Sequence, residues 1–239
     1  MLPRFVGRLG VADVVTIANA VLGFAAVVVA FVDPFEAARL ILLAAVADGL
    51  DGLLARRYGG TPVGPHLDSL ADVVSFGIAP AALAFVVLAD GLGLETGAAT
   101  LELVAVAALC GLFVAMAVTR LALYSAYDVA AEYTEGVQTT LAATVLGAAV
   151  LAGVTDPLVW VLVVAALTYL MVSRIQYPDL LPRDVFIMGV VHVLAILVPT
   201  LAGRTFPWAL LTLAVGYIVL GPWLYWREEH FLRRWHGNA

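Results

Sequence analysis

The sequence predicts an all-α integral membrane protein, built as a bundle of about eight transmembrane helices. Its composition is 63% hydrophobic and only 13% charged, whereas soluble domains average about 45–50% apolar and about 25% charged residues. Its mean hydropathy is +1.03. Because a spanning helix needs about 20 apolar residues, the 239 residues leave no room for a sizeable water-soluble domain. We therefore expect residues 1–239 to form a single membrane domain.

Apolar runs separated by turn residues and charges give the expected helices in order. Breaks fall at Asp33-Pro34, Gly59-Gly60, Asp156-Pro157 and Tyr177-Pro178, because proline and glycine interrupt helices. The first run is too long for a cleaved signal sequence and is expected to remain as a span. The predicted helices are 14–32, 36–58, 67–88, 101–124, 137–154, 157–175, 183–201 and 207–226.

The distribution of arginine predicts the orientation, since cytoplasmic loops of membrane proteins are enriched in basic residues. Arginine supplies every basic charge in this chain. With an even number of spans both termini share one side, and only Arg39 and Arg204 fall on the other. The shared side would hold Arg4, Arg8, Arg56, Arg57, Arg120, Arg174, Arg183, Arg227, Arg233 and Arg234. The sequence thus predicts a cell-membrane protein with cytoplasmic termini and a charged C-terminal helical extension over 227–234.

Charge and cysteine content exclude other classes of protein. The formal net charge of -6 argues against binding to nucleic acid, which depends on clustered basic residues. Cys110 is the only cysteine, so a disulfide scaffold is excluded.

Acidic residues recur at helical spacing in the second and third predicted helices. Asp48, Asp51 and Ala55 lie at i, i+3 and i+7, and Asp68 and Asp72 lie at i and i+4, so each set occupies one helix face. The short connection makes the two helices antiparallel neighbours. We therefore expect four carboxylates to converge near the cytoplasmic boundary.

Converging carboxylates require a cation, because like charges at short range are strongly unfavourable. Hard oxygen ligands suit Mg²⁺, Mn²⁺ or Ca²⁺, and we expect a pair of metal ions. Gly52, Ala55 and Gly64 remove side-chain bulk beside the acids, so that a phosphate-bearing ligand could approach the backbone. Any one of these acids could instead be a solvated helix cap, but their joint spacing favours a metal site.

The acidic pattern resembles the signature of the CDP-alcohol phosphatidyltransferases, membrane enzymes that join a CDP-activated donor to an alcohol. The residues that carry the resemblance are Asp48-x-x-Asp51-Gly52-x-x-Ala55-Arg56 and, after seven residues, Gly64-x-x-x-Asp68-x-x-x-Asp72. The spacer is one residue shorter than is usual for the family, which affects the interhelical loop. Residues 67–77 with Ala79-Pro80 are similar to the phosphatidylserine synthase branch, as are Thr16, Asn19 and Gly23. The resemblance covers the first six helices.

The resemblance implies transfer of a phosphatidyl or archaetidyl group from a CDP-linked lipid to the hydroxyl of L-serine, with release of CMP. It implies two divalent ions, Mg²⁺ or Mn²⁺, held by Asp48, Asp51 and Asp68 with a contribution from Asp72, and a homodimer with its active site facing the cytoplasm. Asp72 is the expected general base. The residues expected to bind the CDP-lipid are Asn19, Gly52, Ala55, Arg56, Gly64 and Ser69.

Recognition of the serine carboxylate needs a cation, and Arg120 and Arg174 fall at cytoplasmic helix ends. Both could make bidentate contacts with a carboxylate, although each could equally serve as a positive-inside anchor. Glu132 and Glu135 could be solvated or could approach the serine amine. We expect His192, in the seventh helix, to form a hydrogen-bonded helix contact.

Two alternative functions remain open at this point. The same family could use glycerol 3-phosphate or an inositol phosphate as acceptor, but an extra phosphate would require more basic residues than this sequence offers. Carboxylates at membrane depth also occur in ion-coupled transporters. That alternative predicts broken helices and inverted repeats, which the sequence does not display.

Overall fold

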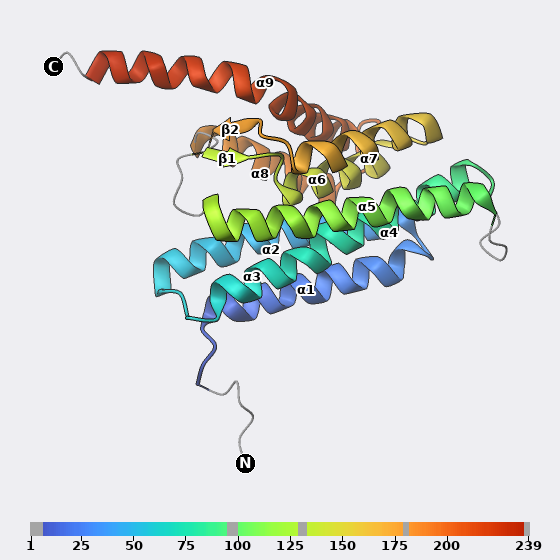
Figure 1. Cartoon of the computed structure of the whole chain (residues 1–239), viewed down its shortest axis with the longest axis horizontal. Coiled ribbons are helices and arrows are strands. Elements are labelled where there is room, and N and C mark those ends of the chain that lie inside the picture. The colour runs from blue at the N-terminus through green and yellow to red at the C-terminus, as the bar shows by residue number, and fades with distance from the viewer. Residues whose placement is uncertain (1–6, 95–99, 129–132, 179–181, 237–239) are drawn as a thin grey trace.

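The structure is a computed structural model that describes residues 7–94, 100–128, 133–178 and 182–236. Its main body is a bundle of long helices (Figure 1). The helices are α1 (Val11–Ala30), α2 (Pro34–Tyr58), α3 (Gly64–Asp72), α4 (Ala79–Gly91), α5 (Leu101–Leu123), α6 (Thr139–Ala152), α7 (Pro157–Met171), α8 (Pro182–Leu197) and α9 (Thr205–His236). Two π-helical segments, η1 (Val73–Ile78) and η2 (Tyr124–Asp128), and two strands, β1 (Tyr133–Glu135) and β2 (Gln176–Pro178), complete the described part.

Helix starts coincide with capping residues in the sequence. The Asp33 carboxylate accepts hydrogen bonds from the backbone N–H groups of Phe35 and Glu36 at 3.0 and 3.1 Å, and Pro34 occupies the first position of α2. Asp156 caps α7 in the same way, with Pro157 following. An oxygen-bearing N-cap followed by proline satisfies free N–H groups and preorganises the first turn, so the predicted breaks at these positions are confirmed.

The third predicted helix is one continuous rod that contains a π-helical segment in its middle. α3, η1 and α4 follow one another without a break from Gly64 to Gly91. The side chain of Ser75 in η1 donates a hydrogen bond to the carbonyl of Asn19 at 2.9 Å. A Cβ atom at Gly23 would lie only 2.7 Å from the Cα atom of Ser75. Glycine at position 23 therefore allows α1 to pack directly against the π segment.

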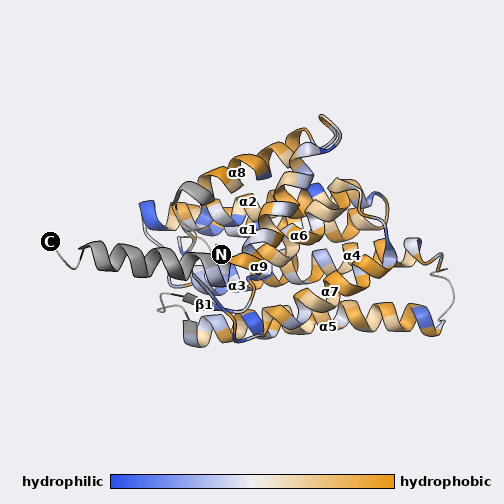
Figure 2. Cartoon of the chain, turned by 90° about the horizontal axis from the view of Figure 1, so that it is seen from above, coloured by the Kyte–Doolittle hydropathy of each residue, from blue (hydrophilic) through white to orange (hydrophobic). Residues whose placement is uncertain are grey.

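Four segments among the described residues are long and apolar enough to cross a membrane. They are Val11–Ala30, Gly64–Gly91, Leu101–Tyr127 and Thr205–Trp223, and α6, α7 and part of α8 are shorter apolar helices. Figure 2 shows hydrophobic residues along the helices and hydrophilic residues mainly towards the ends of the bundle. The predominantly helical fold is thus confirmed, and its long apolar helices are consistent with an integral membrane protein. The number of spans and the side on which the termini lie remain predictions.

The bundle has an apolar interior and an apolar exterior. Phe113, Leu146 and Trp160 belong to one buried cluster, whereas Ile41 and Phe76 belong to a second. Many large apolar side chains are nevertheless exposed on the outer faces of α1, α5, α7 and α9. Such continuous apolar exposure marks a surface that contacts lipid or another apolar partner.

A short antiparallel strand pair links two connections that are distant in sequence. Glu135 of β1 pairs with Gln176 of β2, and Thr134 pairs with Tyr177. The helix predicted over 157–175 is therefore too long, because α7 ends at Met171 and the chain then turns into β2. Gly136 has a φ of +75° and packs against the Met171 carbonyl, which only a residue without a Cβ atom can do.

Several segments meet at one end of the bundle. The start of α1, the end of α2, the start of α3, the end of α5 and the two strands all lie there (Figure 1). α9 continues beyond the bundle to His236 and contains Pro222, so the predicted C-terminal extension is helical. The predicted roles of Arg4 and Glu132, and of the side chains of Arg183, Arg227, Arg233 and Arg234, lie outside the described residues.

Candidate active site

Three of the four predicted acidic residues form a tight cluster between α2 and α3. One carboxylate oxygen from each of Asp48, Asp68 and Asp72 lies within 4.8 Å of the others. The Asp48 side chain lies close to the side chains of Asp72 and of Thr140, the latter from α6. The helical spacing and the short loop thus bring the two acidic faces together as expected.

Asp51 lies beside this cluster without belonging to it. It is 5% exposed, and its Oδ2 atom accepts a hydrogen bond of 2.6 Å from the Thr16 hydroxyl. It is within coulombic range of Asp48 and Asp68. All four carboxylates therefore share one electrostatic environment, with Asp51 oriented by α1.

The first helix also fixes the loop between α2 and α3. Asp13 is 2% exposed, and its Oδ2 atom accepts hydrogen bonds from the Gly10 N–H at 2.7 Å and from the Thr61 hydroxyl at 2.8 Å. The Thr61 oxygen in turn accepts from the Gly64 N–H at 3.1 Å. This chain of bonds positions the first residue of α3 beside the acidic cluster.

A cavity of about 600 Å³ lies beside these residues. Asp51, Asp68 and Asp72 line it, as do Gly52, Ala55, Gly64, Ser69 and Arg120, all of which the sequence predicted as site residues. Asp13, Thr16, Thr61, His66, Tyr124 and Ser125 also line it. A nucleotide or a lipid headgroup has space here next to the carboxylates.

Three predicted site residues lie elsewhere. Asn19 is fully buried, and its side-chain amide atoms have no hydrogen-bond partner. Arg56 is exposed on α2, one helical turn from Gly52. Arg174 is exposed and lines a second, smaller cavity. None of the three is among the residues that line the larger cavity.

Arg120 is the buried cation of the larger cavity. The residue is 7% exposed, and its guanidinium carbon lies 4.9 Å from the centre of the Tyr124 ring. It interacts electrostatically with Asp72. Cation–π contact and an acidic neighbour both stabilise a guanidinium held away from water.

The residues present fit a divalent cation. Asp48, Asp68 and Asp72 offer hard oxygen ligands at converging geometry, as Mg²⁺ and Mn²⁺ require. The Oδ1 atom of Asp72 is buried and has no hydrogen-bond partner. Like charges this close together are costly unless a cation or a proton lies between them. The cluster can therefore hold a metal ion.

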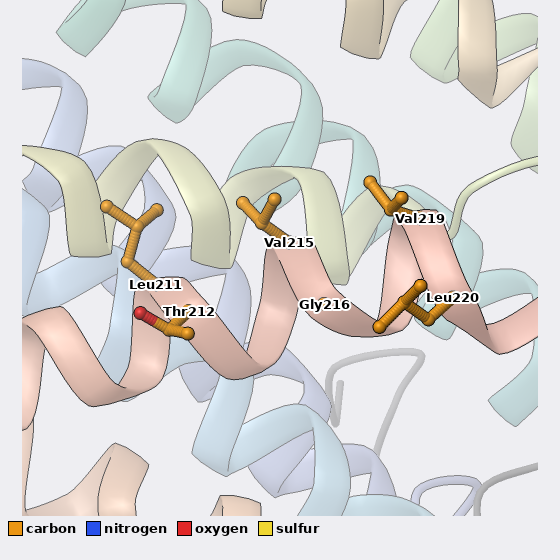
Figure 3. Close-up of a pocket in the computed structure, with 6 residues that line it drawn as sticks. All are labelled: Leu211, Thr212, Val215, Gly216, Val219 and Leu220. Atoms are coloured by element: carbon orange, nitrogen blue, oxygen red, sulfur yellow. The ribbon is translucent and has the colours of Figure 1, made fainter.

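A groove along α9 offers no comparable chemistry. Its lining residues are Leu211, Thr212, Val215, Gly216, Val219 and Leu220 (Figure 3). The one polar side chain there, Thr212, already donates a hydrogen bond to the Trp208 carbonyl at 2.8 Å. The groove is apolar, and the acidic cavity remains the candidate site.

The sequence analysis missed the contacts that α1 and α6 make with the acids. Asp13 was detectable as an isolated acid in an apolar helix, but nothing local showed that it bonds to Thr61. Thr16 belongs to the family resemblance, yet its bond to Asp51 joins residues 35 positions apart. Thr140 is one of several threonines at the start of α6, and only the packing of α2 against α6 singles it out.

The sequence of this chain is similar to those of known proteins. Residues 9–174 match the sequence model of a family described as CDP-alcohol phosphatidyltransferase. The chain is 29% identical over 170 residues to the archaetidylserine synthase of Methanothermobacter thermautotrophicus, an alignment that covers 70% of this chain and 68% of the relative.

Two further relatives share shorter stretches. The CDP-diacylglycerol–serine O-phosphatidyltransferase of Methanocaldococcus jannaschii is 40% identical over 76 residues, which cover 31% of this chain and 35% of the relative. The enzyme of the same name from Saccharomyces cerevisiae is 56% identical over 48 residues, which cover 20% of this chain and 17% of the relative.

Proposed function

Because the chain belongs to the CDP-alcohol phosphatidyltransferase family, we propose that it transfers the phosphatidyl or archaetidyl group of a CDP-linked lipid to the hydroxyl of L-serine. CMP is the leaving group. The observation that carries this proposal is the cluster of Asp48, Asp68 and Asp72 beside a cavity that Asp68, Asp72 and a buried arginine line. The names of the relatives supply the acceptor, serine.

Asp48, Asp51, Asp68 and Asp72 hold the divalent ions of the reaction, Mg²⁺ or Mn²⁺, as a pair. Such ions neutralise charge on phosphate oxygens and orient an in-line displacement. The hydrogen bond from Thr16 orients Asp51, and the Asp13–Thr61–Gly64 chain sets the distance between the two helices that carry the ligands.

Asp72 is the general base. It is 8% exposed and lies one helical turn beyond Asp68, with Arg120 within electrostatic range. It accepts the proton of the serine hydroxyl as the new oxygen–phosphorus bond forms and the bond between phosphorus and the CMP oxygen breaks. A base must lie within hydrogen-bond reach of the proton that it accepts, and the cavity gives serine access to Asp72.

The CDP-lipid occupies the larger cavity, with its phosphates against Gly52, Ala55, Gly64 and Ser69. Residues with little or no side chain let phosphate oxygens approach the backbone closely. Arg56 is exposed beside Gly52 and contacts a phosphate at the mouth of the cavity. Asn19 supports the donor site from the interface between α1 and η1.

We further propose that the protein resides in the cell membrane as a homodimer, with this cavity facing the cytoplasm. Four helices capable of spanning a membrane support the membrane location. Membership of a transferase family removes the ion-coupled transporter as an alternative.

The decisive experiment measures CMP release and product formation together. Purified protein receives Mn²⁺ or Mg²⁺, CDP-diacylglycerol or CDP-archaeol, and labelled serine, glycerol 3-phosphate or inositol phosphate. The proposal predicts one CMP for each labelled serine lipid. No CMP with any acceptor would remove the enzymatic function, and CMP release with glycerol 3-phosphate but not with serine would overturn the choice of acceptor.

A further inference from the structure

The C-terminal helix α9 holds a buried tyrosine of the strand pair. The hydroxyl of Tyr177, in β2, donates a hydrogen bond to the carbonyl of Ile218, in α9, at 3.2 Å. The rings of Tyr177 and Tyr217 lie with their centres 5.9 Å apart, and Tyr177 is only 2% exposed. Both β2 and α9 lie beyond residues 9–174, which match the family model. The family match therefore gives this contact no role.

A proline in α9 explains why the Ile218 carbonyl accepts a hydrogen bond from outside its own helix. Each carbonyl of an α-helix normally accepts from the N–H group four residues later, and that residue here is Pro222. Proline has no N–H group, and an unpaired carbonyl away from water is costly. The Tyr177 hydroxyl supplies the missing donor. The positions of this proline and this tyrosine are therefore matched.

Tyr177 in turn fixes the strand pair, which we call the strap (β1 and β2). Tyr177 pairs with Thr134 across the strap, and the Gly136 N–H donates to the Ile175 carbonyl at 2.8 Å just beyond the pair. β2 contacts α9 on one side, and β1 contacts η2. Figure 1 shows the strap between α9 and the rest of the bundle. A hold on Tyr177 is therefore a hold on the neighbour of η2.

η2 forms part of the wall of the larger cavity. Tyr124 and Ser125 of η2 both line that cavity. The hydroxyl oxygens of Ser125 and of Ser69, in α3, lie 3.1 Å apart, and Ser69 directly follows Asp68. Contacts thus run from α9 through the strap and η2 to the helix that carries two of the acidic residues.

We propose that Tyr177 is a positioning residue for the transfer reaction: held by α9, it keeps the strap against η2 and so keeps this wall of the larger cavity in place. This inference rests on the proposed function, which places the CDP-lipid in that cavity. The wall confines the donor and takes no part in bond making or breaking. Its loosening should therefore weaken binding of the CDP-lipid more than it slows turnover at saturation.

The test uses Tyr177→Phe in the full-length protein, which removes the hydroxyl and keeps the ring beside Tyr217. Tyr169→Phe is the matched control, because Tyr169, on α7, is 71% exposed. Loss of the hydrogen bond should raise the KM for CDP-lipid about three- to tenfold, with kcat changed by less than about twofold. The control should behave as wild type.

A first double variant tests the route through η2. Ser125→Ala removes the hydroxyl that lies next to Ser69 and should also raise the KM for CDP-lipid. If Tyr177 acts through η2, the rise in KM for Tyr177→Phe combined with Ser125→Ala should be smaller than the product of the two single rises, because coupled residues are not additive.

A second double variant tests the match between the proline and the tyrosine. Pro222→Ala returns an N–H group to α9, so the Ile218 carbonyl no longer depends on Tyr177. Tyr177→Phe should then have a smaller effect on the KM for CDP-lipid, and on the thermal unfolding temperature, in the Pro222→Ala background than in the wild-type background.

The outcomes separate this proposal from the proposed function. An unchanged KM for CDP-lipid in Tyr177→Phe, with serine-dependent CMP release intact in wild type, would overturn the positioning role and leave the proposed function standing, even if the unfolding temperature fell. Single rises that multiply fully with Ser125→Ala would overturn the route through η2. An equal rise in Tyr169→Phe would show that the effect is not specific to Tyr177. Absence of serine-dependent CMP release in wild type would remove both proposals.

Discussion

Replacing Thr16 by Val removes the hydroxyl that orients Asp51. In the structure this hydroxyl lies 2.6 Å from Asp51 Oδ2 and 3.1 Å from the Ala12 carbonyl. Both residues are buried, at 4% and 5% exposure. Because valine has nearly the same shape, the substitution removes the hydrogen bond while the packing of α1 against α2 is kept.

The size of the effect follows from the type of bond. A short hydrogen bond to a carboxylate is charge-assisted, and such bonds contribute about 1.5–3 kcal/mol. At about 1.4 kcal/mol per factor of ten, loss of this bond corresponds to a decrease of about 10- to 150-fold in metal affinity or activity. Removal of an outer partner of a metal ligand typically costs about 10- to 100-fold in metal affinity or activity. We therefore expect the Mn²⁺ concentration for half-maximal activity to rise by about tenfold or more.

The assay is CMP release as a function of Mn²⁺ concentration, at saturating CDP-lipid and serine. Thr16→Ser keeps the hydroxyl and should remain close to wild type. Thr168→Val is the matched control, since Thr168 is 5% exposed and bonds only within its own helix, to the Val164 carbonyl at 2.7 Å. If Thr16→Val and Thr168→Val gave the same Mn²⁺ dependence, orientation of Asp51 by Thr16 would be refuted.

Three further predictions concern the base, the loop and the packing of α1. Asp72→Asn should abolish CMP release without lowering the thermal unfolding temperature, and residual turnover near the wild-type rate would exclude Asp72 as base. Thr61→Val loses both hydrogen bonds of that side chain and should raise the KM for CDP-lipid, whereas Thr61→Ser should not. Gly23→Ala should destabilise the fold by about 1–3 kcal/mol in thermal unfolding. Gly111→Ala, where an added Cβ has no neighbour within 4 Å, should be neutral or stabilising.

The helices and the acidic cluster could be predicted because both depend on local patterns. Apolar runs of about 20 residues, together with the capping groups at Asp33 and Asp156, determine where helices begin. Asp48 lies on one face of α2, and Asp68 and Asp72 lie on one face of α3. The short loop makes the two helices neighbours, so that these faces meet. The family resemblance was confirmed by the match over residues 9–174.

The remaining features depend on contacts between distant residues. The strand pair joins Glu135 to Gln176, and three-residue strands carry too little alternation to be detected in a sequence. The π segment in the third rod packs closely against Gly23 at Ser75, and the hydrophobic periodicity of the sequence gives no sign of this contact. The hydrogen bonds of Asp13 and Thr16 could not be predicted for the same reason, because they form only where α1 packs against its neighbours.

Donor-site assignments away from the acidic motif were the least predictable. Asn19 was expected to contact the CDP-lipid from α1, but helical position alone does not say which side of a helix faces a cavity. The structure buries Asn19 against the π segment. Gly52 and Gly64, which lie next to the acids in sequence, do line the cavity. Arg56, which also belongs to the motif, does not line the cavity.

Binding of Mn²⁺ to the purified protein without substrates tests the central claim most directly, and electron paramagnetic resonance measures it. Wild type should bind Mn²⁺ in the absence of CDP-lipid, and Asp68→Asn combined with Asp72→Asn should abolish that binding. Asp90→Asn, which changes an exposed acid at the end of α4, should bind Mn²⁺ as wild type does. Equal Mn²⁺ binding by wild type and the double variant would contradict a metal site formed by α2 and α3.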